Sequence, residues 1–265
     1  MGTTMEQARL RSANDPWLNG RPPHIPTDGR VLPSVCLLPG DPDRVSLASA
    51  VLDDFELVGE KREYRLGVGR FNGHQVAICS TGIGGPSTEI AIVELSRLGV
   101  TTFIRVGGMG AIPAGIVPGS ITSVASTLRD GGTARFYAEG EDPIPAHSEV
   151  LDALAAGAAA HGETLTPVTV MSCDSYYVGE GRSLPGLEQV AADRLSDVFR
   201  RGADAMDMEC ETVFAVAKAL GRRYGSILAT HGNRATDEWL EDYAPVQHRM
   251  LTIACEAAAI LSTDG

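Results

Sequence analysis

The sequence lacks the features that would anchor it in a membrane or divide it into domains. No run approaches the ~18 apolar residues that a membrane-spanning helix requires, and the N-terminal segment has no apolar core of signal-peptide length. No Pro/Ser-rich linker or block of charge interrupts the 265 residues. We therefore predict one domain over residues 24–265, preceded by a proline-rich arm over residues 1–23 that is disordered at its start. We expect the protein to be cytoplasmic.

Positive charge and paired cysteines are also scarce. Lys+Arg number 22 against 34 Asp+Glu, so the net charge is −12, which argues against nucleic acid or an anionic membrane as the main partner. A small anionic ligand is still compatible, because its site needs only a few converging arginines. The five cysteines form no CxxC pair and are expected to be reduced, packed thiols. The scattered His and Cys residues show no metal-ligand spacing.

The most informative stretch that is present covers residues 79–112. It predicts a strand end, a glycine turn over 82–85, a helix, a β-branched strand over 102–106 and a second glycine turn. Arg105 falls at the carboxyl end of that strand, where open α/β sheets place their ligands. An anion site is predicted there.

A second candidate anion site lies earlier in the chain. A strand over 34–38 runs into Gly40 and a helix that starts with proline and contains Arg44. Free backbone N–H groups at such a turn can hold an oxyanion, and Arg44 can reach the same place. An ordinary strand-to-helix turn with a surface arginine is the alternative interpretation.

Two polar segments lie later in the chain. Tyr176, Glu180 and Arg182 follow a strand and can stack on and hydrogen-bond a flat heterocycle, or form a mobile loop with an incidental ion pair. Asp207 and Glu209, spaced by two at a helix start, can both bind sugar hydroxyls, although plain capping of the helix dipole explains the same acids.

Alternating strand and helix signals predict an α/β fold with a mixed sheet. Strands with turns at Gly59, at Gly67 and Gly69, and at Asn72-Gly73 are expected over 56–80. Helices are expected over 148–161 and 243–261, with a late strand ending near Asn233-Arg234. His24 is the one chemically interesting residue of the early segment, or a plain surface histidine.

Together these residues resemble a known family. The motifs LLPGDPDRV, STGIGGPSTEIAIVEL, RVGGMGAI, Y-Y-x-G-x-x-R, MDME and the late N-R are similar to those of the hexameric nucleoside phosphorylases, most closely the uridine phosphorylases, over residues 24–261. The resemblance implies a three-layer αβα sandwich whose central mixed β-sheet is flanked by helices. It also implies phosphate-dependent cleavage of a uridine-like nucleoside to free base and ribose 1-phosphate, with inorganic phosphate as co-substrate and no cofactor.

The resemblance assigns site residues position by position. The positions that match phosphate-binding residues are Gly40, Arg44, Arg62, Arg105 and Gly108. Those that match ribose-binding residues are His24, Asp207, Met208 and Glu209. Those that match base-binding residues are Met109, Gly110, Tyr176, Glu180, Arg182 and Arg234. Arg105, Arg182 and Glu209 are expected to carry the chemistry. Arg62 and His24 would come from a neighbouring subunit, so the resemblance implies at least a dimer, and a hexamer built as a trimer of dimers.

The sequence departs from the family pattern at the phosphate and ribose positions. Gly108 and Met109 stand where the family has two threonines, and the lost hydroxyl should weaken phosphate binding by about 1–2 kcal/mol. Asp207 replaces a longer glutamate, a change that we expect to matter little.

Glu180 is the departure that bears on the base. It replaces a glutamine that hydrogen-bonds both N3–H and O2 of uracil, whereas a carboxylate cannot donate to O2 and would repel the departing anion. Either Glu180 is protonated or turned away, or the base offers two adjacent donors, as guanine does. The alternatives are therefore phosphorolysis of a purine or modified nucleoside, hydrolysis by a nucleosidase, and nucleoside binding without turnover. Retention of Arg44, Arg62 and Arg105 argues against the nucleosidase.

Overall fold

The computed structural model describes residues 12–138, 140 and 142–262. The elements of the first half are β1 (Val35–Leu38), α1 (Pro42–Leu47), β2 (Asp53–Lys61), β3 (Tyr64–Phe71), β4 (His74–Cys79), α2 (Gly85–Arg97), β5 (Thr102–Ala111) and β6 (Ile121–Leu128). Those of the second half are β7 (Ile144–Pro145), α3 (Ser148–Ala160), β8 (Thr166–Ser172), α4 (Glu188–Arg200), β9 (Ala205–Asp207), α5 (Cys210–Ala219), β10 (Arg223–Asn233), β11 (Glu238–Trp239) and α6 (Ala244–Leu261).

The strands form one mixed sheet, part of which closes on itself. Its order is β11-β10-β6-β8-β9-β5-β1-β4-β3-β2, and β10 also pairs with β5. Strands β5, β10, β6, β8 and β9 therefore make a closed ring, because β10 pairs with both β5 and β6 and β9 pairs with both β8 and β5. Beyond the ring the sheet continues through β1 and β4, each parallel to its neighbour, and ends in the antiparallel β2–β3–β4 strands.

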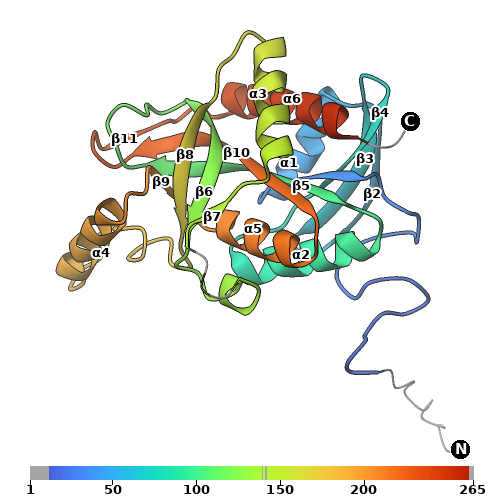
Figure 1. The fold of residues 1–265 in the computed structure, drawn as a ribbon, viewed down its shortest axis with the longest axis horizontal. Helices are drawn as coiled ribbons and strands as arrows, with labels where there is room; N and C mark the ends of the chain where they lie inside the picture. Colours follow the sequence, from blue (N-terminus) through green and yellow to red (C-terminus); the bar gives the residue numbers. More distant parts are fainter. Residues whose placement is uncertain (1–11, 139, 141, 263–265) are drawn as a thin grey trace, which may run out of the picture.

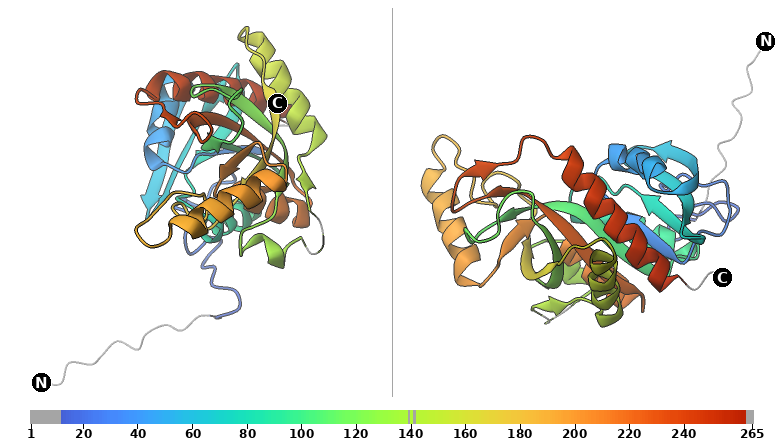
Figure 2. Two further views of the ribbon diagram at one scale, coloured as in Figure 1. Left: turned by 90° about the vertical axis from the view of Figure 1, so that its left-hand side faces the viewer. Right: turned by 90° about the horizontal axis from the view of Figure 1, so that it is seen from above.

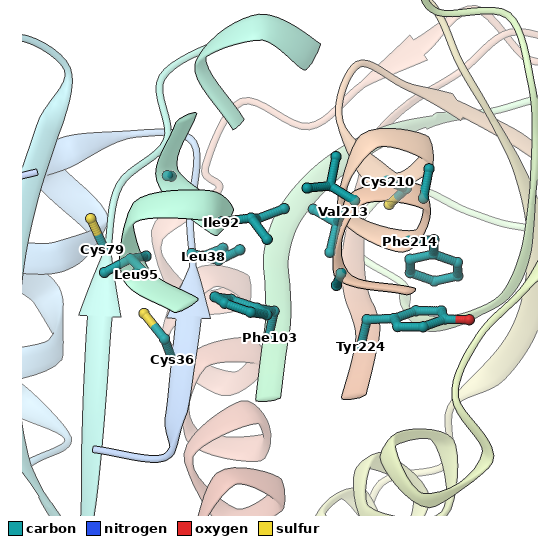
Figure 3. Packing of buried hydrophobic residues seen from close by; sticks show 14 of the residues in the cluster. Cys36, Leu38, Cys79, Ile92, Leu95, Phe103, Cys210, Val213, Phe214 and Tyr224 are labelled. Atoms are coloured by element: carbon teal, nitrogen blue, oxygen red, sulfur yellow. The ribbon is translucent and has the colours of Figure 1, made fainter. Parts of the chain in front are cut away.

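Helices cover both faces of this sheet, as expected for a three-layer fold. Figure 1 shows α3 and α6 on one side and α2 and α5 on the other. Successive strand residues point to opposite faces, so Phe103 joins the core beneath α2 and α5 while Ile104 joins the core beneath α3 and α6. Figure 3 shows the first of these cores, in which Phe103 lies next to Leu38 and Ile92. Burial on both faces explains why the central strands are almost uninterrupted apolar runs.

Helix α4 stands apart from both layers. It was not predicted from the sequence, and Figure 2 shows it at one end of the molecule. A small cluster that includes Met171, Val198 and Met206 holds it against the ring. Most of its surface stays in solvent, with Phe199 70% exposed.

Several predicted turns are wrong. Gly59, Gly67 and Gly69 lie inside β2 and β3, and the chain reverses instead at Arg62. The second glycine turn after residue 106 does not form, because β5 continues to Ala111 beside β10. In these strands glycine makes room for a neighbouring side chain: a Cβ at Gly67 would lie 2.6 Å from the Phe55 ring. The Asn72-Gly73 turn is confirmed, since both residues have positive φ.

The described part of the N-terminal arm, residues 12–23, contains a single isolated bridge between Leu18 and Arg21. Trp17 packs its ring on the guanidinium of Arg97, 4.0 Å from the ring centroid to Cζ, and Asp15 forms an ion pair with the same arginine. The arm therefore lies against the end of α2. The expected disorder falls on residues 1–11, which lie outside the described residues.

Candidate functional site

A cavity of about 720 Å³ opens at the carboxyl ends of β1, β5 and β10. Most of the residues predicted from the sequence to bind ligand line it. Its lining includes the four predicted phosphate residues Gly40, Arg44, Arg105 and Gly108, and Tyr176, Glu180 and Arg182 from the loop after β8. Met109, Gly110, Asp207, Met208 and Glu209 also line it. Strand ends and following loops thus bring together three segments that lie far apart in sequence.

Arg105 is the centre of a buried charge cluster. Its Nε donates to Asp207 at 2.9 Å and its Nη2 forms an ion pair with Glu209 at 2.5 Å. Burial disfavours the charged guanidinium, but Glu209 and Asp207 outweigh that cost and raise the pKa of Arg105. The guanidinium folds back over the strand, since a Cβ on Gly107 would lie 2.7 Å from its Cζ. One fixed cation therefore joins the two acids.

The two acids differ in what remains available to a ligand. Asp207 also accepts from the hydroxyl of Ser172 at 2.5 Å and from the amide of Cys210 at 3.0 Å, and its side chain is fully buried. Asp207 therefore serves Arg105 and the start of α5. Glu209 accepts from the amide of Gly84 at 2.7 Å and keeps lone pairs facing the cavity it lines.

The predicted glycine turn over 82–85 forms, and it binds a carboxylate of the protein itself. Gly82 and Gly84 have φ of 71° and 92°, which only glycine adopts readily. This conformation aims the Gly84 amide at Glu209. Burial raises the pKa of Glu209, while Arg105 and the Gly84 amide oppose that rise. Glu209 is thereby fixed from two sides. Glu211, the third acid of the segment, turns away and accepts from the amide of Gly131 at 2.7 Å.

The loop after β8 supplies another part of the cavity wall. Arg182 forms an ion pair with Glu180 and donates to the carbonyl of Tyr176, and its Cζ lies 3.8 Å from the centroid of the Tyr176 ring. Glu180 is 4% exposed. Burial raises its pKa to about 7 despite the adjacent Arg182. Near neutral pH this side chain therefore exists as both acid and carboxylate.

Arg234 supports this loop without lining the cavity. Its Nη2 donates to the carbonyl of Gly181 at 2.7 Å.

Asn233, the residue before Arg234, holds together backbone segments of the fold. Its Nδ2 donates to the carbonyls of Pro113 and Ile116, and its Oδ1 accepts from the amides of Ala235 and Thr236.

Two further predicted residues, besides Arg234, do not reach the cavity of their own chain. Arg62 is exposed at the β2–β3 turn, and His24 is held by the buried Glu94, which accepts from the ring Nδ1 at 2.7 Å and from the amide of Ile25 at 2.7 Å. Their expected contribution to a neighbouring subunit stays a prediction. Glu63, which follows Arg62, does line the cavity.

Sequence reasoning missed two aromatic residues of the cavity wall, His231 and Trp239. The rings of His231 and Trp239 stack with centroids 5.4 Å apart. His231 lies near the carboxyl end of β10, the place already expected to face a ligand, so its position in the strand was the available signal. Trp239 lies in the two-residue strand β11, and no pattern in the sequence around it indicated that it lines the cavity.

Within residues 12–138, 140 and 142–262, no three His, Cys, Asp or Glu side chains are placed to hold a metal ion. No helix in that part of the chain has the length and apolar character needed to cross a bilayer.

The fold and the cavity define a class: an α/β protein with a ligand site built from buried arginines and carboxylates at the strand ends of a mixed sheet. Residues 34–263 match the family model of the phosphorylase superfamily, so the chain belongs to that superfamily.

Individual relatives agree with this assignment. The chain is 39% identical to a uridine phosphorylase of Thermococcus kodakarensis over 207 residues, which cover 77% of this chain and 74% of the relative. It is 33% identical to a guanosine phosphorylase of Halorubrum lacusprofundi over 80% of this chain and 83% of the relative. It is 32% identical to the uridine phosphorylase of Escherichia coli over 77% of this chain and 82% of the relative.

Proposed function

We propose that the protein is a nucleoside phosphorylase that cleaves the N-glycosidic bond of a uridine-like nucleoside with inorganic phosphate. The products are the free base and ribose 1-phosphate. The observation that carries this proposal is the set of groups that line one cavity: Arg44 near Arg105, Arg105 paired with Glu209, and Glu180 paired with Arg182. These groups suit an anion, a sugar and a flat polar base.

The chemistry assigns a task to each group. Phosphate attacks C1′ of the ribose while the bond to the base breaks, so positive charge builds on the sugar and negative charge on the base. Arg44 and Arg105 would position the nucleophile, and Glu209 would hold the ribose hydroxyls close to Arg105. Arg182 would stabilise the leaving base. Donors preorganised in this way contribute roughly 3–4 kcal/mol each to the transition state.

The base is the least constrained part of the proposal. A protonated Glu180 donates one hydrogen bond and accepts another, like the amide it replaces, and so suits uracil. An ionised Glu180 suits a base with two adjacent N–H donors. The pKa of about 7 places both forms within reach, and the similarity to a guanosine phosphorylase supports keeping guanosine as the second candidate.

The proposed reaction needs no metal or organic cofactor. We further propose a cytoplasmic enzyme of nucleoside catabolism and pyrimidine salvage, for which five buried, unpaired thiols are compatible support. Activity that survives dialysis against a chelator would support the cofactor proposal.

We also propose a homo-oligomer, at least a dimer and specifically a hexamer built as a trimer of dimers. Its support is that Arg62 is exposed outside the cavity while the neighbouring Glu63 lines it. Ile83 lines the cavity too and is 78% exposed, which leaves an apolar edge for another chain to cover.

The experiment that tests the activity measures base release from uridine, thymidine, 5-substituted uridines, cytidine, inosine and guanosine, each with and without phosphate. We expect release from uridine only when phosphate is present. Equal release without phosphate would replace the phosphorylase by a nucleosidase. Tight nucleoside binding without release under either condition would replace it by a binding protein.

A further inference from the structure

The anion-binding part of the cavity has fewer available donors than its arginines suggest. Two of the three guanidinium nitrogens of Arg105 already contact Asp207 and Glu209. Arg62 lies outside the cavity. Arg44 remains, and one of its nitrogens donates to the carbonyl of Val106 at 3.3 Å. A phosphate dianion beside two buried carboxylates would therefore be stabilised by a further donor from this chain.

His231 occupies the position from which such a ligand would act. It sits at the β10 bulge between Thr230 and Gly232, where the ladder with β5 shifts register. Its Nε2 lies 2.8 Å from the place a Cβ on Gly108 would take. The imidazole thus fills the space over Gly108 that a side chain at residue 108 would use. Both residues line the cavity, as Arg44 does.

The imidazole nitrogens of His231 are not used inside the fold. Neither nitrogen hydrogen-bonds to another described residue. Neither is fully buried without a partner, as Nδ1 of His147 is, so both are accessible to a ligand. Burial, and then the charge of Arg44, lower the pKa of His231 to about 4. The ring is therefore a neutral imidazole, with one N–H to donate and one nitrogen to accept.

Tyr243 fixes both candidate ligands. Its ring stacks on His231 with centroids 3.5 Å apart at 24°, and the Arg44 Cζ lies 5.7 Å from its centroid. Tyr243 is 8% exposed and begins the turn into α6. Stacking of this kind restricts the rotation of the imidazole and holds it toward Gly108.

We propose that His231 is a phosphate-binding residue of this enzyme, with Tyr243 as its positioning residue. The imidazole and Arg44 then hold the oxyanion between them, in place of a side chain at Gly108. This inference rests on the proposed function. It goes beyond it, because none of the residues assigned from the family motifs includes His231 or Tyr243.

The test compares steady-state kinetics of three variants with uridine and phosphate varied separately. His231→Phe keeps a ring in the stack and removes both nitrogens. Tyr243→Leu removes the stack. His147→Phe is the matched control. His147 forms another His–Tyr pair, in which its ring centroid lies 6.1 Å from that of Tyr224, and it does not line the cavity.

We expect His231→Phe to raise the KM for phosphate about tenfold, the effect of a lost hydrogen bond to a charged group. The KM for uridine should change by less than about twofold, and His147→Phe should leave both constants near their original values. Tyr243→Leu should raise the phosphate KM less than His231→Phe does. The double variant should be no worse than His231→Phe, because the two residues act as one unit.

An unchanged phosphate KM in His231→Phe would overturn the inference while leaving the phosphorylase activity intact. An equal rise of both KM values would also overturn it, since that pattern indicates distortion of the whole cavity. Direct titration of each folded variant with inorganic phosphate by calorimetry gives the same comparison without turnover. If the unmodified enzyme releases base without phosphate, the proposed function itself fails, and this is known before any variant is made.

Discussion

At the scale of single residues, Glu180 is the side chain whose state decides what the cavity accepts. It is buried beside Arg182, and burial moves its pKa to about 7. Uracil requires the protonated acid, because one donor and one acceptor must face N3–H and O2. Guanine requires the carboxylate. The same residue therefore gives the two candidate substrates opposite pH dependences.

For uridine we expect kcat/KM to fall as the pH rises through about 7, approaching tenfold per pH unit above that value. Glu180→Gln should remove the fall, because the amide presents the same donor and acceptor at every pH. Profiles of kcat/KM from about pH 6 to 8.5 for both forms of the enzyme measure this. A uridine profile that rises over this range would show that the carboxylate is the active form, and guanosine should then be the better substrate.

Part of the site was predictable because its residues follow strands. Glu209 comes directly after β9, Glu180 lies in the loop after β8, and strand ends are where open α/β sheets place ligands. Arg105 was predicted at a strand end but lies within β5, which continues to Ala111. His231 obeys the same rule, but a lone histidine in a strand is usually packing or surface. Its role depends on the empty space above Gly108 and on the stacked Tyr243, neither of which any local pattern contains.

At the scale of elements, β5 is the strand whose glycines were misinterpreted. Glycines at 107, 108 and 110 predicted a turn, yet the strand continues to Ala111. The structure shows two different reasons for glycine. Gly107 makes room for the guanidinium of Arg105, whereas a Cβ on Gly110 would meet nothing within 4 Å. Tertiary pairing with β10 overrides the local preference of glycine for turns.

This difference gives a paired prediction. Gly107→Ala should lower the free energy of unfolding by about 1–3 kcal/mol, because the new methyl group must displace a buried guanidinium that holds two carboxylates. Gly110→Ala should change it by less than about 0.5 kcal/mol or stabilise slightly, since alanine restricts the unfolded chain. Urea unfolding of both variants at one pH measures the two values. Equal losses would mean that glycine is needed in β5 for its backbone and not for the space beside Arg105.

At the scale of the whole molecule, the sequence allowed the layers to be predicted but not the closure of the ring. Alternating strand and helix signals, with strands buried on both faces, are enough to predict helices on both sides of a mixed sheet. The closure depends on β9, three residues long, pairing with β5. Such a short segment has no periodicity to detect. Helix α4 was missed although Ala191, Leu195 and Val198 follow helical spacing, and Leu195 and Val198 pack against Met171 and Met206.

The proposed oligomer can be tested by mixing two defective chains. Arg44→Ala damages the cavity of its own chain, whereas Arg62→Ala should damage only the cavity of the neighbour. If each cavity takes Arg62 from the adjoining subunit, a mixed pair contains one intact site. Co-expression of the two chains should therefore restore about a quarter of the unmodified activity at saturating substrate and low phosphate. No recovery in oligomers purified successively on two different affinity tags, one on each chain, would place Arg62 outside the site.

The closed ring also bears on when the site comes into existence during folding. Met206 of β9 pairs with Gly110 of β5, and β10 must then insert on the other side of β5. These pairings join segments about a hundred residues apart, and contacts of that kind form late and slowly. Gly40 and Arg44 follow β1 and do not depend on the ring, but Arg105, Glu180 and Glu209 belong to ring strands or to loops that leave them. A chain still emerging from the ribosome therefore has only part of the cavity wall, and the complete site, in which Arg105 pairs with Asp207 and Glu209, forms only once the ring has closed.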